Sequence, residues 1–207
     1  MTERLPTVVI GAGHNGLVCA AYLARAGRKV LVLESSDHVG GAAVTREFAP
    51  GFRVSAVAHL LQLLDPVVER ELQLAYHGLQ YAHTPLATVA LSPSAPPLSF
   101  LDAEIQSGAV SAADRAALQA FVPRMRKFSR FIARQHGRVP PRLGFRNWRD
   151  ALPAAAVAFD LRRLGQRDMR EFLRVATMNI YDVLEENFEN PLLKAALALD
   201  GVLGARL

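Results

Sequence analysis

Cysteine, lysine and long apolar runs are scarce in this chain of 207 residues. The single cysteine, Cys19, excludes an internal disulfide, a Cys-x-x-Cys redox pair and a zinc site built from several cysteines, and we expect no metal site. Charged residues or glycine interrupt every apolar stretch before it reaches the length of a membrane-spanning helix. The N-terminus has no charged segment followed by a long apolar one, so no secretory signal is expected. These absences predict a reduced, cytoplasmic protein.

The composition is that of a globular chain with one strongly basic region. Apolar residues make up 51% and charged residues 21%, which is enough apolar material for a packed core. Of the 24 basic residues 21 are arginine, and residues 115–174 hold 15 basic residues against four acidic ones. The rest of the chain is mildly acidic. The arginines have two open interpretations, which are a codon preference and a functional basic surface.

The first 34 residues have the pattern of a strand–helix–strand unit. Residues 7–10 (TVVI) are an uncharged β-branched run, typical of a strand buried on both faces of a parallel sheet. A helix follows in residues 17–26, with apolar residues at helical spacing and Gly27 as its end. Residues 29–34 (KVLVLE) form a second strand that ends in Glu34. Together they predict one βαβ unit with a parallel sheet.

The rest of the chain is predicted to be mostly helical. We expect short strands at 88–91 and 98–101 and helices at 65–77, 112–135, 149–164, 167–187 and 191–200. Several carry capping signals: Asp65 with Pro66, Ser111 with Asp114, and Asn190 with Pro191 and Gly201. The fold class is therefore α/β, with a Rossmann-like βαβ half in residues 1–64 and a partial, mostly helical (α+β) substrate domain in residues 65–207.

The helix at 112–135 has an apolar stripe and a basic side. The stripe consists of Leu118, Phe121, Val122, Met125, Phe128 and Ile132, and the basic side carries Arg126, Arg130 and Arg134. The simplest interpretation is a packing face against neighbouring helices. The alternative is peripheral contact with an anionic membrane surface. Nucleic acid is not expected as a partner, because no aromatic residues are interleaved with the arginines.

The sequence GAGHNG at 11–16 carries the chemistry. Gly11 allows the tight turn after a strand, Gly13 leaves room for a pyrophosphate, and Gly16 lets the helix approach the sheet. The helix N-terminus attracts phosphate through its free N–H groups. Glu34 can accept hydrogen bonds from the ribose hydroxyls of an adenosine and would repel a 2′-phosphate. This combination predicts FAD or NAD as the cofactor and excludes NADP.

A second glycine pair, Gly40-Gly41, favours the longer ligand, FAD. The run VIGAGHNGLVCAAYLARAGRKVLVLESSDHVGGAAVTREFAPGFR at 9–53 resembles the N-terminal motif of FAD-dependent oxidoreductases of the phytoene-dehydrogenase and amine-oxidase type. Residues 165–201 (GQRDMREFLRVATMNIYDVLEENFENPLLKAALALDG) are also similar to that group. In one respect the chain departs from many amine-oxidase relatives, because Ala42-Ala43-Val44-Thr45 separate the glycine pair from Arg46.

The resemblance implies an oxidoreductase in which a hydride passes from a C–H bond of an apolar or lipid-like substrate to a flavin. It implies a set of FAD-binding residues: Gly11, Ala12, Gly13, Asn15, Gly16, Glu34, Gly40, Gly41 and Ala42. Proteins of this group are much longer, so the chain is expected to be an N-terminal portion that works with a C-terminal half or a second copy. The alternatives are an NAD-binding dehydrogenase and an inactive remnant or interaction module.

Several other side chains have both a functional and a structural interpretation. For His14 the two interpretations are contact with a phosphate and exposure to solvent. For His59 they are an acid–base group beside the flavin and a buried structural histidine. Cys19 is expected to pack in the core. Residues on later helices line a substrate cavity or a solvated face: Tyr181, Asp182 and Glu185. Trp148 is expected to anchor a linker. The spacing singles out no catalytic acid or base.

Overall fold

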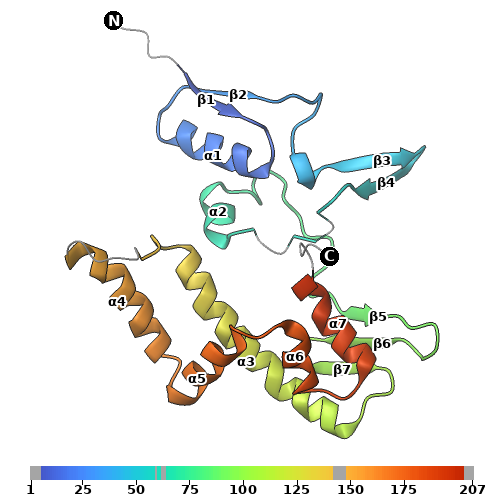
Figure 1. Cartoon of the computed structure of the whole chain (residues 1–207). Helices are drawn as coiled ribbons and strands as arrows, with labels where there is room; N and C mark the ends of the chain where they lie inside the picture. Colours follow the sequence, from blue (N-terminus) through green and yellow to red (C-terminus); the bar gives the residue numbers. More distant parts are fainter. Residues whose placement is uncertain (1–5, 59, 62–63, 142–147, 203–207) are drawn as a thin grey trace, which may run out of the picture. The chain divides into compact units, whose positions relative to one another are not determined.

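The computed structural model describes residues 6–58, 60–61, 64–141 and 148–202 (Figure 1). The chain divides into two compact units, Met1–Ala82 and His83–Leu207. The helix that begins at Pro66 therefore belongs to the first unit, whereas the sequence analysis placed it at the start of the second domain. Each unit has its own sheets and helices and is described by itself.

The first unit contains the predicted βαβ element. Strands β1 (Thr7–Ile10) and β2 (Val30–Leu33) are parallel, with Val8 opposite Leu31. Helix α1 (His14–Arg25) connects them and lies along one face of the pair (Figure 1). The helix ends as predicted, because Gly27 adopts the left-handed conformation at φ +75°. The prediction of a Rossmann-like parallel pair is confirmed.

The expectation that these strands are buried on both faces is wrong. Val8, Ile10, Leu31 and Leu33 share one face of the sheet and are exposed, Ile10 to 87%. The alternate residues on the other face are half-buried beneath α1. Side chains alternate between the two faces of a strand, so one covering helix shields only every second residue. Within the described part of the first unit, no element covers the other face.

The segment after β2 forms a hairpin that the sequence analysis did not predict. A short 3₁₀ turn, η1 (Gly41–Ala43), leads into the antiparallel strands β3 (Thr45–Ala49) and β4 (Phe52–Ser55). Most of their residues are exposed. The sequence of β4 alternates apolar and polar residues over only four positions, that of β3 has no regular alternation, and Pro50-Gly51 marks the turn between them.

Helix α2 (Pro66–Glu71) begins as predicted and ends earlier. Asp65 caps it, with Oδ1 accepting a hydrogen bond from the Val67 N–H at 2.7 Å. The prediction extended the helix to residue 77. Gln73, however, adopts a left-handed backbone at φ +52°, which ends regular helix geometry.

The second unit combines a small sheet with five helices in its described part. Strands β5 (Thr88–Ala90), β6 (Leu98–Leu101) and β7 (Glu104–Ser107) form an antiparallel sheet in that order. The helices are α3 (Ala112–His136), α4 (Trp148–Arg162), α5 (Gln166–Val175), α6 (Ile180–Glu185) and α7 (Pro191–Val202) (Figure 1). Strand β7 was not predicted, and Asp102 turns the chain into it with φ +56°.

Two further helix boundaries, both in the second unit, differ from the predictions. The helix expected at 167–187 is two helices, because the Asn179 side chain caps a new one, with Oδ1 accepting from the Asp182 N–H at 2.9 Å. Helix α7 continues through Gly201 instead of stopping there. A Cβ at Gly201 would lie 3.2 Å from Ile180 Cγ2, so this glycine gives close helix packing. The predicted Asn190 cap is confirmed by bonds from the Leu192 and Leu193 N–H groups.

The core of the second unit is formed by α3, the sheet, α6 and α7. Its buried residues are Leu98, Phe100, Leu118, Phe121, Val183, Leu184, Phe188 and Leu193. The apolar stripe of α3 is thus a packing face, as predicted, with one exception. Ile132 is 42% exposed, and the neighbouring Phe131 is buried instead. The Phe131 ring makes an edge contact with the Phe172 ring, with 4.9 Å between the ring centroids.

A buried carboxylate joins the start of α3 to the start of α7. Asp114 is 2% exposed, and its two oxygens accept the Glu189 and Asn190 N–H groups at 2.8 and 2.9 Å. The Asp114 N–H in turn donates to Ser111 Oγ at 3.0 Å, which confirms the predicted cap. These bonds connect residues about 75 positions apart, so Asp114 fixes where the last helix begins.

Replacing Asp114 with alanine should destabilise the second unit. Two partly buried N–H groups would lose a carboxylate acceptor that is itself buried, which should cost about 2–4 kcal/mol in free energy of unfolding. Urea unfolding followed by circular dichroism measures the change. The control is Glu104→Ala at an exposed acid of β7, which should change stability by less than about 0.5 kcal/mol. Equal effects of the two substitutions would contradict this role for Asp114.

Candidate functional site

The turn between β1 and α1 needs glycine at its first and last positions. Gly11 has φ +94°, and its N–H donates to the Leu33 carbonyl at 2.7 Å. A Cβ at Gly16 would lie 2.1 Å from the Gly11 carbonyl oxygen, closer than any side chain tolerates. These two glycines therefore let the helix start directly above the strand end, as the sequence analysis expected of them.

Gly13, between them, has no structural reason to be glycine. Its backbone is extended, at φ −68° and ψ 169°, a conformation open to any residue. A Cβ built on Gly13 meets no described atom within 4 Å. Neither strain nor packing thus requires glycine, and the missing side chain leaves open space above the backbone. This is the geometry that a pyrophosphate lying against the turn requires.

The start of α1 offers hydrogen-bond donors beside that space. The first N–H groups of a helix have no acceptor within the helix, and Gly13, the N-cap residue, has no side chain to accept from them. His14 and Asn15 are exposed on this first turn. The structure agrees with the solvent-facing interpretation of His14. The free N–H groups and the helix dipole favour an anion at this position.

The second glycine pair lies against the first turn. The Gly40 N–H donates to the Ala12 carbonyl at 2.8 Å, and Gly13 and Gly40 form a parallel bridge. Gly40 and Gly41 both have left-handed backbones, at φ +119° and +57°. A Cβ at Gly41 would lie 3.0 Å from Gly13 Cα, and exposed Ala42 follows. The turns at residues 11–16 and 40–41 thus lie side by side, and together they form a continuous stretch of backbone without large side chains.

Glu34 is held at the same place by backbone N–H groups. Its Oε2 accepts from the Ala12 N–H at 2.6 Å, and its Oε1 accepts from the Ser35 and Ser36 N–H groups at 2.9 and 3.0 Å and from Ser36 Oγ at 2.9 Å. These bonds, that from Ala12 foremost, lower the pKa of Glu34 to about 2. The carboxylate stays charged, and Oε2 keeps acceptor capacity for a ribose hydroxyl.

Sequence reasoning missed the side chains that orient this acid. Ser36 Oγ bridges Glu34 Oε1 and the His38 carbonyl, which lies 2.9 Å away. His38 Nδ1 lies 2.6 Å from Asp37, and this contact lowers the pKa of the Asp37 carboxyl. The Ser-Ser pair directly after the strand-ending acid was the available signal, since serine commonly bonds to nearby backbone and side-chain acceptors.

The remaining candidate residues are not gathered at this site. Cys19 is exposed, so the expectation that it packs in the core is wrong. It lies off the face of α1 that contains Gly16, Ala20 and Leu23, the positions spaced to meet the sheet. His59 lies outside the described residues, and the structure does not describe the side chain of Trp148.

The candidate residues on the later helices lie on a solvated face. Tyr181, Asp182 and Glu185 are all exposed on α6. Asp182 Oδ2 accepts from the Asn179 side chain at 2.6 Å, and Glu185 forms an ion pair with Lys194 at 2.5 Å. Tyr181 and Glu185 border an open groove of about 400 Å³ between α6 and α7.

The structure of α3 gives little support to the alternative that this helix lies on a membrane surface. Leu118, Phe121 and Phe128 are buried, so the apolar stripe is used for internal packing. Within the part of the chain that the structure describes, no helix combines the length and the apolar character needed to cross a membrane. Contact of the basic side with a membrane surface stays a prediction.

The comparisons with known proteins match both the turn and the chain as a whole. Residues 9–73 match the family described as NAD(P)-binding Rossmann-like domain. Pyridine nucleotide-disulfide oxidoreductase domain-containing protein 2 of Rattus norvegicus is 38% identical over 96% of this chain and 37% of its own length. The chain is a relative of that protein. It spans little more than a third of the length of the rat and mouse proteins.

Two further relatives match shorter parts of the chain. A limonene dehydrogenase chain of Castellaniella defragrans is 48% identical over 43% of this chain and 16% of its own length. All-trans-retinol 13,14-reductase of Macaca fascicularis is 56% identical over 21% of this chain and 7% of its own length. The named family and these relatives imply a dinucleotide cofactor, FAD or NAD(P), and a general oxidoreductase relationship.

Replacing Gly16 with alanine should disrupt the turn itself. The new Cβ would collide with the Gly11 carbonyl, so α1 must move away from β1. We expect a loss of about 1–3 kcal/mol in the stability of the first unit, together with loss of nucleotide binding. Thermal unfolding by circular dichroism measures the first effect. The matched substitution Gly13→Ala has open space and should leave the melting temperature unchanged; equal destabilisation by both would contradict this assignment.

The charge of Glu34 should make the first unit sensitive to acid. Because its folded pKa of about 2 lies below its ordinary value of 4.5, its contribution to stability is complete above pH 4.5. The contribution is lost as the pH falls from 4.5 to about 2. The stability difference between wild type and Glu34→Gln should therefore be constant above this window and shrink within it. Urea unfolding at a series of pH values measures the difference. A constant difference at every pH would contradict this account.

Proposed function

We propose that this chain is the dinucleotide-binding portion of a FAD-dependent oxidoreductase that takes a hydride from a C–H bond of an apolar or lipid-like substrate. The observation that carries the proposal is Gly13, a glycine that the fold does not need and whose open side a bound pyrophosphate would use. The helix N-terminus and Glu34 flank it with the donors and the acceptor that a dinucleotide requires.

The preference for FAD over NAD rests on the contiguous second turn. Gly40 bridges to Gly13, so bare backbone continues beyond the pyrophosphate position. A longer ligand gains contact there, whereas the NAD-type motif alone needs only the first turn and the acid. The resemblance of residues 9–53 to flavin oxidoreductases supports the same choice.

The residues have defined tasks in this proposal. The N–H groups of the first turn of α1 bind the pyrophosphate, and the Glu34 carboxylate accepts from a ribose hydroxyl while its charge rejects a 2′-phosphate. The Ala12 N–H holds that carboxylate in place. Bound FAD would supply the hydride-accepting ring, and the protein supplies position and electrostatics. We assign no catalytic acid or base.

The substrate class is supported by the names of the two relatives with shorter matches. One is named for dehydrogenation of limonene and the other for reduction of all-trans-retinol, both largely hydrocarbon molecules. The chain covers only a small part of each relative, so the substrate is carried over as a class. A complete enzyme would add the remainder of the site through a C-terminal portion or a second copy.

An NAD-dependent dehydrogenase is the second candidate. It is favoured by one finding, the match of residues 9–73 to the NAD(P)-binding Rossmann-like family. Glu34 fits NAD as well as FAD, because both carry an unphosphorylated adenosine ribose. The two candidates therefore differ in the ligand retained and not in the turn that holds it.

FAD retention tests the proposal directly. We expect the purified chain to be yellow or to become so with added FAD, with flavin absorbance and quenched fluorescence. Gly13→Val fills the open space and Glu34→Ala removes the ribose acceptor, so each should weaken FAD binding about tenfold or more. Fluorescence titration with FAD measures this loss.

Gly137→Val is the matched control for the glycine change. Gly137 also has an ordinary backbone, at φ −82°, and no atom within 4 Å of its Cβ position, but it lies at the end of α3. It should leave FAD affinity unchanged. A colourless chain that binds NAD would replace the first candidate with the second. Unchanged FAD occupancy in both site variants would contradict the proposed site altogether.

A further inference from the structure

A cleft between α3 and α5 is lined by arginines from both helices. Its volume is about 430 Å³, and it lies entirely within the second unit. The residues that line it are Arg124, Gln166, Arg167, Asp168, Arg170, Glu171 and Arg174. Phe172 of α5 packs against Phe128 and Phe131 of α3. The centroid of its ring lies 5.4 Å from that of Phe128 and 4.9 Å from that of Phe131. Ring contacts of Phe172 thus hold the two helices that border the cleft together.

The two acids of the cleft already have basic partners. Asp168 forms an ion pair with Lys127, whose Nζ also donates to the Leu164 carbonyl at 2.7 Å. Glu171 accepts two bonds from the Arg174 guanidinium, at 2.8 and 3.2 Å. These hydrogen bonds lower the pKa of both carboxyl groups. Both acids are thus charged and internally neutralised.

One guanidinium group of the cleft is paired only at long distance, and two have no hydrogen-bond or ion-pair partner in the described ranges. Arg124 reaches Glu171 only at 3.9 Å and keeps 32% of its side chain exposed. Arg167 and Arg170 make no hydrogen bond and no ion pair with any residue in the described ranges. The cleft consequently has a surplus of positive charge. A guanidinium presents a planar fork of donors that matches phosphate oxygens.

The backbone adds further donors at the same position. Helix α5 begins at Gln166, and its N-cap residue, Gly165, has no side chain to accept from the first N–H groups. The helix dipole places partial positive charge there, beside Arg167. Side chains and backbone thus favour the same kind of ligand at this end of the cleft.

We propose that the cleft between α3 and α5 binds a phosphate group, with Arg124, Arg167 and Arg170 as its ligands. The ligand is a phosphomonoester or diphosphate, either free in solution or in a lipid headgroup. The site is separate from the glycine turn, which belongs to the first unit, and it does not depend on which dinucleotide that turn binds.

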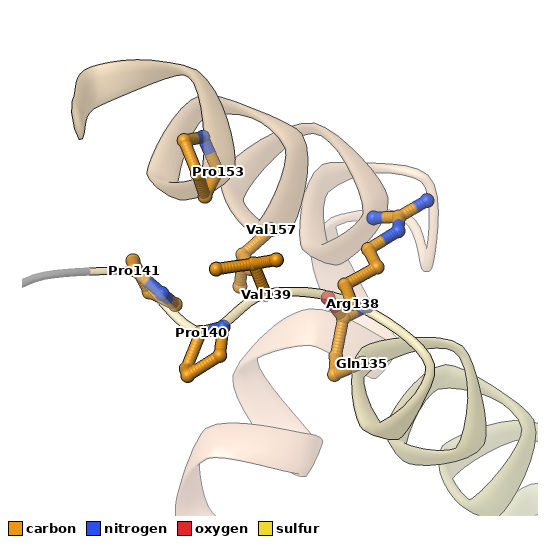
Figure 2. A pocket seen from close by; sticks show the side chains of 7 residues that line it. All are labelled: Gln135, Arg138, Val139, Pro140, Pro141, Pro153 and Val157. Carbon is orange, nitrogen blue, oxygen red and sulfur yellow. The ribbon is translucent and has the colours of Figure 1, made fainter. Parts of the chain in front are cut away.

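A cavity at the end of α3 in the same unit lacks these properties. It lies between the end of α3 and α4 and measures about 260 Å³ (Figure 2). Its lining is mostly proline and valine, and Figure 2 shows Val139 beside Val157 while the Arg138 side chain extends away from the prolines. Arg138 is already paired with Asp160 at 2.7 Å. Uncompensated positive charge therefore distinguishes the cleft at α5.

The test is titration of the full chain with inorganic pyrophosphate by calorimetry. All proteins carry Gly13→Val, so that the glycine turn does not contribute to phosphate binding. Arg167→Gln with Arg170→Gln should weaken pyrophosphate binding about tenfold or more, since two charge-assisted contacts are lost. The matched control, Arg130→Gln with Arg134→Gln, removes the same charge from exposed positions of α3 outside the cleft and should bind like the parent.

A second arm separates the two sources of phosphate. Phosphatidylcholine vesicles with and without phosphatidic acid are sedimented with the same proteins. Pyrophosphate binding without sedimentation supports a soluble ligand, and sedimentation that needs both phosphatidic acid and the cleft arginines supports a lipid headgroup. Failure of both probes, or an equal loss in the two double variants, would overturn the proposal.

Discussion

The candidate site depends on one carboxylate that connects two strand ends. Glu34 stands at the end of β2, and its bond from the Ala12 N–H reaches the turn that follows β1. The serines after it complete the hydrogen bonding of its other oxygen. Because this acid is held by main-chain donors, its position follows from the backbone and not from a mobile partner. The acid proposed to bind ribose and the turn proposed to bind phosphate are thereby fixed in one arrangement.

Much of this arrangement could be predicted from the sequence, because its constraints are local. Gly11, Gly16 and Glu34 follow a known spacing, and each position is explained by sterics or by hydrogen bonding over a few residues. What the sequence could not distinguish is why each glycine is needed. The structure separates them, since Gly16 is required by the fold and Gly13 is not. That distinction gives Gly13 its value as evidence for a ligand.

The sequence-based predictions fail for features that depend on contacts between residues far apart in the sequence. Most residues of the hairpin β3–β4 are exposed, and its strands are too short to give a strong periodic signal. Cys19 is exposed because it lies off the face of α1 that contains Gly16, Ala20 and Leu23. The break after α5 depends on a single asparagine cap in a continuous helical pattern. The arginine cleft could not be predicted either, because the sequence does not show which arginines form ion pairs with acidic residues. Arg126 binds Asp102, whereas Arg167 and Arg170 have no such partner among the described residues.

The sheet of the first unit has a practical consequence for work with this chain. Val8, Ile10, Leu31 and Leu33 form an uncovered apolar surface on a pair of strands whose outer edges have unpaired main-chain groups in the described structure. Such surfaces promote self-association and nonspecific adsorption. Particle sizes measured at high protein concentration or high salt would therefore include contacts made through this surface. A physiological assembly is better judged from dilute samples, in which such adhesion is weakest.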